Sequence, residues 1–237
     1  MQQKSTYRFT DGMKDSIPIF LGYISVSFGF GVLAVQGGLS VLQAAFISLT
    51  NVTSAGQLEG LSLIAAAASL IEVILAEVVI NIRYSLMSIS LTQKLDPSFG
   101  TGARLVCGFC VTDEVFGVAS SKAGSLGKHY FLGLIVLPVA GWVLGTAVGA
   151  TAGSVLPDMV RSCLGLMLYA MFIAIVVPPS MQNKAVLFAV LASAALSLVF
   201  TLVPFFSFMT PGFSVVVCAL AASVPAAILF PVKEGEA

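Results

Sequence analysis

Apolar runs of about twenty residues follow one another along almost the whole sequence, from residue 17 to residue 230. The hydrocarbon core of a bilayer is about 30 Å thick, and an α-helix needs ~20 apolar residues to cross it. Only 9% of the residues are charged, whereas soluble domains carry about 25%. Because so few charges cannot cover a water-facing surface, we expect lipid to cover most of it. The sequence therefore predicts an all-α, polytopic membrane protein.

Eight runs have the length of a membrane span, with approximate limits 17–36, 39–70, 71–92, 103–121, 129–150, 160–178, 185–203 and 208–230. The second run is too long for one straight crossing, and it contains the polar stretch TNVTSAGQLEG (50–60). An interrupted helix is tolerated at membrane depth where it lines a protein cavity. We predict a single transmembrane domain over residues 1–237, with seven or eight transmembrane helices and at least one of them interrupted.

Lysine and arginine in short loops indicate the orientation of the chain. We expect residues 1–16 to be a short cytoplasmic segment without a cleavable signal, and residues 231–237 to be a short tail. Eight crossings then place seven basic residues inside and three outside, the latter being Lys94, Arg104 and Arg161. If 39–70 is instead a re-entrant hairpin, the division is six against four. The larger bias favours eight crossings, and the hairpin remains the alternative.

Two further patterns concern packing and repetition. Glycines recur every four residues in GWVLGTAVGATAG (141–153), which makes a smooth helix face that another backbone can approach closely. We expect this face to pack within the chain, with an interface to a second subunit as the alternative. NVTSAGQ (51–57) and CVTDEVF (110–116) share only Val-Thr, and the prolines of TLVPFFSFMTPGF (201–213) would interrupt a helix. Two broken segments in different halves are typical of inverted-repeat transporters.

Charged residues inside the apolar runs are the most informative feature for function. They are Glu59, Glu72, Glu77, Arg83, Asp113 and Glu114. Facing lipid, six such groups would cost roughly 15–20 kcal/mol, more than the typical stability of a domain, about 5–15 kcal/mol. We therefore expect them to face one another, backbone dipoles or water.

Helix geometry narrows the partners of Arg83. Glu72 lies on the same helix face about three turns away, and no carboxylate lies three or four residues from Arg83. Its counter-ion must then come from another segment, with Asp113 or Glu114 preferred and Glu59 next. Glu77 and Asn81 form an i, i+4 pair on a neighbouring face. For Glu72 and Glu77 a structural ion pair or a place near the head-groups remains an equal alternative to a functional role.

These residue types suit a zwitterionic solute. Its carboxylate would meet Arg83 or free N–H groups at a broken helix, its ammonium would meet a carboxylate, and apolar residues would form a side-chain pocket. A carboxyl group in such a cavity can also carry a proton. The predicted substrate-binding residues are Asn51, Thr53, Gly56, Gln57, Glu59, Asn81, Arg83 and Thr112. Those predicted for proton coupling or ion pairing are Asp113, Glu114 and Glu77.

Other functional classes receive less support from the sequence. Cys107 and Cys110 form C-G-F-C, but His129 is the single histidine, so we expect helix packing rather than a metal or redox site and predict no cofactor. No serine lies in a G-x-S-x-G turn, and Asp113 has no second aspartate at membrane depth, so an intramembrane enzyme is disfavoured. A passive channel also needs a polar lumen and remains an alternative. The net charge of +0 gives no indication of a nucleic-acid partner.

Three stretches in order resemble one family, the AzlC-type large subunit of bacterial branched-chain amino acid exporters. They are PIFLGYISVSFGFGVLA (18–34), VINIRYSLMSISL (79–91) and VTDEVFG (111–117). The second matches the family's Asn-x-Arg-x-x-Leu segment at Asn81, Arg83 and Leu86. The third matches Thr-Asp-Glu-x-Phe at Thr112, Asp113, Glu114 and Phe116.

The sequence departs from the family pattern at several positions. In SAGQLEG, Ala55 and Gly56 match, Gln57 comes early, and Glu59 stands where a glutamine is usual. Tyr84 replaces a common histidine and Ser25 a common proline. An acid in place of a neutral amide could alter substrate choice or coupling.

The resemblance implies an exporter of valine, leucine and isoleucine, sometimes methionine, in the bacterial cytoplasmic (inner) membrane. It also implies a small AzlD-type membrane subunit as partner. The glycine face at 141–153 is a candidate dock for that subunit, with the span 71–92 as the alternative.

Overall fold

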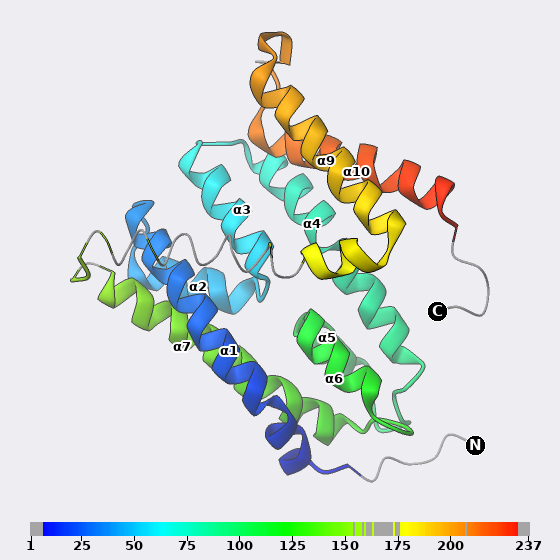
Figure 1. The fold of residues 1–237 in the computed structure, drawn as a ribbon. Helices are drawn as coiled ribbons and strands as arrows, with labels where there is room; N and C mark the ends of the chain where they lie inside the picture. The colour runs from blue at the N-terminus through cyan, green and yellow to red at the C-terminus, as the bar shows by residue number, and fades with distance from the viewer. Residues whose placement is uncertain are drawn as a thin grey trace. The chain divides into compact units, whose positions relative to one another are not determined.

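A computed structural model describes residues 7–153, 155–157, 159, 163, 173, 176–206 and 208–231 of the chain (Figure 1). The secondary structure of these residues is helical, with no β-strand among them. The elements are α1 (Phe9–Gln36), α2 (Val41–Thr50), α3 (Ser54–Ala65), α4 (Leu70–Thr92), α5 (Thr101–Phe109), α6 (Asp113–Ser121), α7 (Lys128–Ala152), α9 (Lys184–Leu202), the 3₁₀ turn η1 (Pro204–Phe206) and α10 (Pro211–Leu229).

The chain divides into two compact units. Unit 1 comprises Met1–Leu58 and Ile80–Gly165, and unit 2 comprises Glu59–Val79 and Leu166–Ala237. Helices α3 and α4 each contribute residues to both units. The functional residues discussed below lie mainly in unit 1.

Four described helices are long and apolar enough to cross a membrane: α1, α7, α9 and the Gly212–Leu229 part of α10. Helix α4 is 23 residues long and follows the predicted span 71–92 closely, but it carries Glu72, Glu77 and Arg83. The predicted spans 129–150, 185–203 and 208–230 correspond to α7, α9 and α10. The predicted span 160–178 lies almost entirely outside the described residues. A total of seven or eight crossings is therefore not established.

Helix α1 begins earlier than the sequence indicates. It starts at Phe9 rather than near residue 17, so most of the predicted N-terminal segment 1–16 is helical where it is described. The start is stabilised by Asp11 in the first turn, whose Oδ2 atom accepts from the backbone N–H of Arg8 at 2.8 Å. Hydropathy misses this turn because its residues are polar.

Helices α1 and α7 run parallel and touch through glycines. A Cβ atom at Gly133 would overlap the carbonyl oxygen of Phe9, and one at Gly149 would overlap that of Phe28. A Cβ atom at Gly141 would likewise overlap Phe20, and one at Gly145 would overlap Ile24 and Ser27. The glycine face therefore packs within the chain, as favoured from the sequence, and it is not available as a dock for a second subunit.

The segment 39–70 is interrupted, as predicted. Helix α2 ends at Thr50 and α3 begins at Ser54, so residues 51–53 form the break. Gln57 Nε2 donates to Ser48 Oγ at 2.7 Å. In a straight helix these residues would lie about 13 Å apart along the axis, so the chain bends at the break. The segment is therefore not one straight helix.

The predicted span 103–121 is not a single crossing. It consists of α5 and α6, nine residues each, separated by Cys110, Val111 and Thr112. The chain returns to the end from which it entered, because Lys94 Nζ, after α4, donates to the carbonyl of Lys122, after α6, at 2.6 Å. Leu126 N also donates to the carbonyl of Lys94 at 2.7 Å. The sequence interpretation of this segment was wrong, and α5 and α6 form a re-entrant pair.

This turn gathers basic residues at one end of unit 1. Lys122 forms an ion pair with Asp15 of α1 at 2.7 Å, and the N–H of Lys128 donates to Ser98 Oγ at 3.2 Å. The basic residues at this end are Arg8, Lys14, Lys94, Arg104, Lys122 and Lys128, whereas the described connections at the other end of unit 1, 37–40, 153 and 155–157, contain none. The positive-inside rule predicts that an end with such an excess of basic residues faces the cytoplasm. The placement of Lys94 and Arg104 on the opposite side from Lys122 and Lys128 was therefore wrong, and a cytoplasmic N-terminus stays a prediction.

Unit 2 is built on an antiparallel pair, α9 and α10. Phe188, near the start of α9, and Phe230, at the end of α10, lie 6.0 Å apart between ring centroids. The predicted interruption at 201–213 corresponds to the connection between these helices, where α9 ends at Leu202 and η1 follows. Gly212 at the start of α10 lies against Leu63 and Glu72.

Candidate functional site

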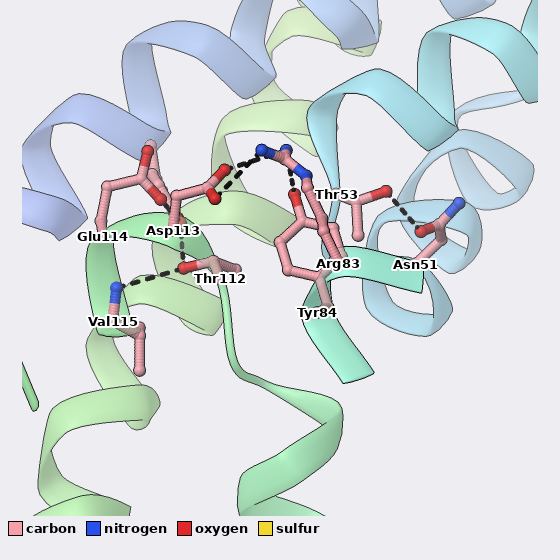
Figure 2. Close-up of polar contacts among 9 residues, drawn as sticks. Asn51, Thr53, Arg83, Tyr84, Thr112, Asp113, Glu114 and Val115 are labelled. Atoms are coloured by element: carbon pink, nitrogen blue, oxygen red, sulfur yellow. Dashed lines mark hydrogen bonds and ion pairs between the residues drawn. The ribbon is translucent and has the colours of Figure 1, made fainter. Parts of the chain in front are cut away.

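Two tripeptides of similar sequence form the helix breaks. Asn51-Val52-Thr53 separates α2 from α3, and Cys110-Val111-Thr112 separates α5 from α6. A threonine immediately precedes the second helix in both cases. Thr112 Oγ1 accepts from the N–H of Val115 at 3.4 Å, which caps α6. Thr53 Oγ1 lies 2.9 Å from Asn51 Oδ1 (Figure 2). The Val-Thr pair shared in the sequence thus marks equivalent positions.

A cavity of about 540 Å³ lies within unit 1 and is lined by residues of both breaks. Its polar lining consists of hydroxyl, amide and phenol groups from the first break and from α4, with Arg104 as its one charged member. The lining residues are Thr50, Asn51, Val52, Thr53, Asn81, Tyr84, Ser85, Ser88, Ile89, Arg104, Leu105, Gly108, Phe109 and Val111. Broken backbone at membrane depth is expected beside such a protein-lined cavity.

A smaller, mostly apolar pocket of about 160 Å³ adjoins this cavity. The two share Ser88, Ile89, Arg104, Gly108 and Val111. The remaining residues of the smaller pocket are Leu91, Thr92, Leu95, Phe99, Cys107 and Phe131. A cavity with hydroxyl and amide groups in part of its wall, beside a more apolar pocket, is the arrangement expected for a small ligand with one polar end.

Arg83 and Asp113 form a two-point ion pair between α4 and the start of α6 (Figure 2). Arg83 Nη2 lies 2.9 Å from Asp113 Oδ2, and Nη1 donates to Oδ1 at 3.0 Å. Nη2 also donates to the Tyr84 hydroxyl at 2.8 Å. The structure therefore shows the counter-ion that was preferred from the sequence. The pair lies next to the cavity through Tyr84 but is not part of its lining.

Glu114 has a different partner from Asp113. The Tyr23 hydroxyl donates to Glu114 Oε2 at 2.5 Å and lies 2.6 Å from Thr112 Oγ1. Tyr23 is buried and packs edge-on against Trp142, with 5.0 Å between the ring centroids. The first turn of α6 is thus held to α4 by Asp113 and to α1 by Glu114. Tyr23 was not singled out from the sequence, although it belongs to the Gly-Tyr part of the first family motif.

Gln57 stabilises the first break and does not line the cavity. It is 1% exposed, and its Nε2 group donates to Ser48 Oγ, which lies 2.6 Å from Thr146 Oγ1 of α7. Its Oε1 atom has no hydrogen-bond partner within the described part of the chain. Gly56 is buried beside it. These two residues therefore fix the turn between α2 and α3.

The other three acidic residues found within the apolar runs, Glu59, Glu72 and Glu77, belong to unit 2. Glu72 and Ser69 cap the start of α4, since the N–H of Ser69 donates to Glu72 Oε2 at 2.8 Å. Glu72 is thus part of a helix cap, a structural role that was not predicted from the sequence. Glu59 follows Leu58 at the start of unit 2. Glu77 lies beside α3, where a Cβ atom at Gly60 would be 3.2 Å from Glu77 Oε1.

The structure therefore divides the predicted site residues into groups. Asn51, Thr53 and Asn81 line the cavity, while Arg83, Thr112, Asp113 and Glu114 form the adjacent polar network. Gly56, Gln57, Glu59 and Glu77 line neither cavity. Ser85, Ser88 and Arg104 were not predicted, although the two serines lie on α4 within two turns of Asn81.

Among the four cysteines, Cys107, Cys110 and Cys218 are buried, Cys163 is exposed, and none forms a disulfide. Cys107 belongs to the wall of the apolar pocket. Burial among apolar neighbours agrees with the packing role expected for Cys107 and Cys110.

A helical membrane protein with two interrupted helices around a polar cavity is the class defined by this geometry. The family model described as AzlC protein matches residues 18–156, more than half of the chain. The chain therefore belongs to the AzlC family.

Similar proteins are found in bacteria and archaea. Inner membrane protein YgaZ of Escherichia coli is 32% identical, with 74% of each chain covered. An uncharacterized membrane protein of Archaeoglobus fulgidus is 34% identical over 72% of this chain and 75% of its own. The branched-chain amino acid transport protein AzlC of Bacillus subtilis is 24% identical over 74% of this chain and 69% of its own. No solved structure matches the chain.

Proposed function

We propose that this protein exports small neutral amino acids, primarily valine, leucine and isoleucine and also methionine, across a bacterial cytoplasmic membrane. The observation that supports this most directly is the cavity at two helix breaks, which has hydroxyl and amide groups in its wall and a more apolar pocket beside it. An amino acid has the same division into a polar end and an apolar side chain. Membership of the AzlC family and the name of the B. subtilis relative point in the same direction.

In the proposed mechanism the solute binds between the two breaks and is exposed to each side in turn. Asn51, Thr53 and Asn81 supply neutral hydrogen-bonding groups to the solute. The first turn of α6, held by Asp113 and Glu114, is the element whose contacts with α4 and α1 change between states. Transport would be coupled to protons if Asp113 takes up a proton when it separates from Arg83, or if Glu114 does so when it separates from Tyr23.

An AzlD-type small membrane subunit is the proposed partner. Its dock is not the glycine face of α7, which α1 covers. The α4 face remains the alternative expected from the sequence.

The test is counterflow in proteoliposomes that contain the purified chain, with and without the small subunit. Vesicles loaded with unlabelled leucine should accumulate labelled leucine above its equilibrium level, and an imposed pH gradient should change the rate. A passive channel would equilibrate the label without any overshoot. Failure of leucine, valine, isoleucine and methionine to show counterflow in both preparations would contradict the proposal.

A further inference from the structure

Arg104 lies on α5 and lines both the polar cavity and the adjoining apolar pocket. It is the only charged side chain among the described residues that line either of them. The combined space therefore carries a positive formal charge and no carboxylate. This differs from the sequence prediction, in which Arg83 meets the solute and acidic residues meet its ammonium.

The guanidinium of Arg104 makes fewer polar contacts than that of Arg83. Its Nε atom donates to the carbonyl of Phe99 at 3.4 Å, and within the described residues no partner is found for its two terminal nitrogens. In contrast, Arg83 is occupied by Asp113 on both terminal nitrogens, and Lys122 is paired with Asp15. An arginine fork of this kind matches a carboxylate with two parallel hydrogen bonds.

Resting on the proposed transport function, we propose that Arg104 binds the solute's carboxylate and that the ammonium group is not recognised by an ion pair. With the carboxylate on Arg104, an aliphatic side chain can enter the pocket formed by Leu91, Leu95, Phe99 and Phe131. The ammonium then meets neutral oxygens such as those of Asn51 and Ser88. The site therefore recognises a carboxylate next to a branched apolar group. Its ligands would include 2-oxo acids with the same side chains as valine, leucine and isoleucine.

The experiment is competition against labelled leucine in the counterflow assay with three unlabelled compounds: leucine, 4-methyl-2-oxopentanoate and leucine amide. The oxo acid lacks the ammonium, and the amide lacks the carboxylate. The concentration of oxo acid that halves the uptake of labelled leucine should be within about threefold of that of unlabelled leucine. For the amide this concentration should be higher by about tenfold or more, as expected for loss of a charge-assisted contact. A wild-type protein that accepts the amide as readily as leucine, or rejects the oxo acid by tenfold, would overturn the proposal.

Arg104→Gln should abolish the preference for leucine over its amide, and Arg104→Lys should retain part of it. Lys128→Gln is the matched control, because Lys128 lies at the same basic end and lines neither cavity. An unchanged preference in Arg104→Gln would mean that Arg104 serves only at the membrane interface, for example on lipid phosphate, and would overturn the proposal.

A second readout separates this proposal from transport itself. The shift in Tm of the purified chain on adding each compound reports binding without turnover. If wild-type protein shows no counterflow but leucine and the oxo acid raise its Tm and the amide does not, the transport function fails and carboxylate recognition stands. If counterflow is normal and the amide stabilises wild type as strongly as leucine, carboxylate recognition fails and the transport function stands.

Discussion

At the scale of single residues, the main question is how an arginine is accommodated within an apolar helix. Arg83 is neutralised by Asp113 through two contacts, and its guanidinium carbon lies 4.7 Å from the centroid of the Tyr84 ring. The pair could be predicted because helix spacing excluded a partner within α4. The role of Arg104 could not, because its assignment to an outer helix end depended on a crossing that does not exist.

The ion pair between Arg83 and Asp113 predicts that the effects of substituting its two members on stability are coupled. Arg83→Gln and Asp113→Asn should each lower the Tm of the purified protein, because each leaves one charge unpaired, whereas the double variant should recover part of the loss. Both side chains are more than 40% exposed, so we expect a coupling free energy of only about 1 kcal/mol. This corresponds to a Tm difference of about 2–4 °C.

The control for this cycle is Lys184→Gln, an exposed charge at the start of α9, which should leave Tm unchanged. If the double variant loses as much Tm as the two single variants together, the two side chains do not stabilise one another in the purified protein.

At the scale of elements, apolar runs predicted α4, α7, α9 and α10 well because each run fills one helix. The break at 51–53 was also predictable, since polar residues surround it. The break at Cys110–Thr112 was not, because Gly108, Phe109 and Val111 keep the run apolar. The signal was present as a capping threonine followed by two acidic residues, which is typical of a helix start, but a hydropathy window averages it away.

The contact between α1 and α7 predicts a strongly position-dependent effect of added methyl groups. Gly149→Ala should destabilise the protein by about 1–3 kcal/mol, because the new Cβ would overlap the carbonyl of Phe28 and push the helices apart. Gly22→Ala in α1 is the matched control, since nothing lies within 4 Å of its added Cβ. It should be neutral or slightly stabilising.

Thermal unfolding of both variants in the same detergent would measure this difference. Equal Tm values for Gly149→Ala and Gly22→Ala would contradict the close approach of the two helices.

At the scale of the whole molecule, the re-entrant pair α5–α6 changes the topology expected from the sequence. It brings the connections at 93–100 and 122–127 to one end of unit 1, together with the start of α1. The seven-to-three charge count treated these connections as lying on opposite sides. The corrected arrangement gathers six described basic residues at one end of unit 1, which the positive-inside rule assigns to the cytoplasm. They are Arg8, Lys14, Lys94, Arg104, Lys122 and Lys128.

Cysteine accessibility provides the corresponding prediction. In a Cys163→Ser background, which removes the exposed native thiol, Gln93→Cys and Ala123→Cys should both react with a membrane-impermeant maleimide only after permeabilisation. Gln36→Cys, at the opposite end of α1, should react in intact spheroplasts. Labelling of positions 93 and 123 from opposite sides of the membrane would show that the segment 103–121 crosses it, and would contradict the re-entrant pair.

The central claim is that the cavity between the two helix breaks holds the transported amino acid, and solute protection of a cavity residue tests it most directly. Ser88 lines both the polar cavity and the apolar pocket, so the alkylation rate of Ser88→Cys in the Cys163→Ser background reports occupancy. Saturating leucine should slow this rate about fivefold or more, as expected for a site occupied most of the time, and should leave Ala123→Cys unaffected. An unchanged rate at Ser88→Cys, in a variant that still transports leucine, would place the substrate elsewhere and contradict the account.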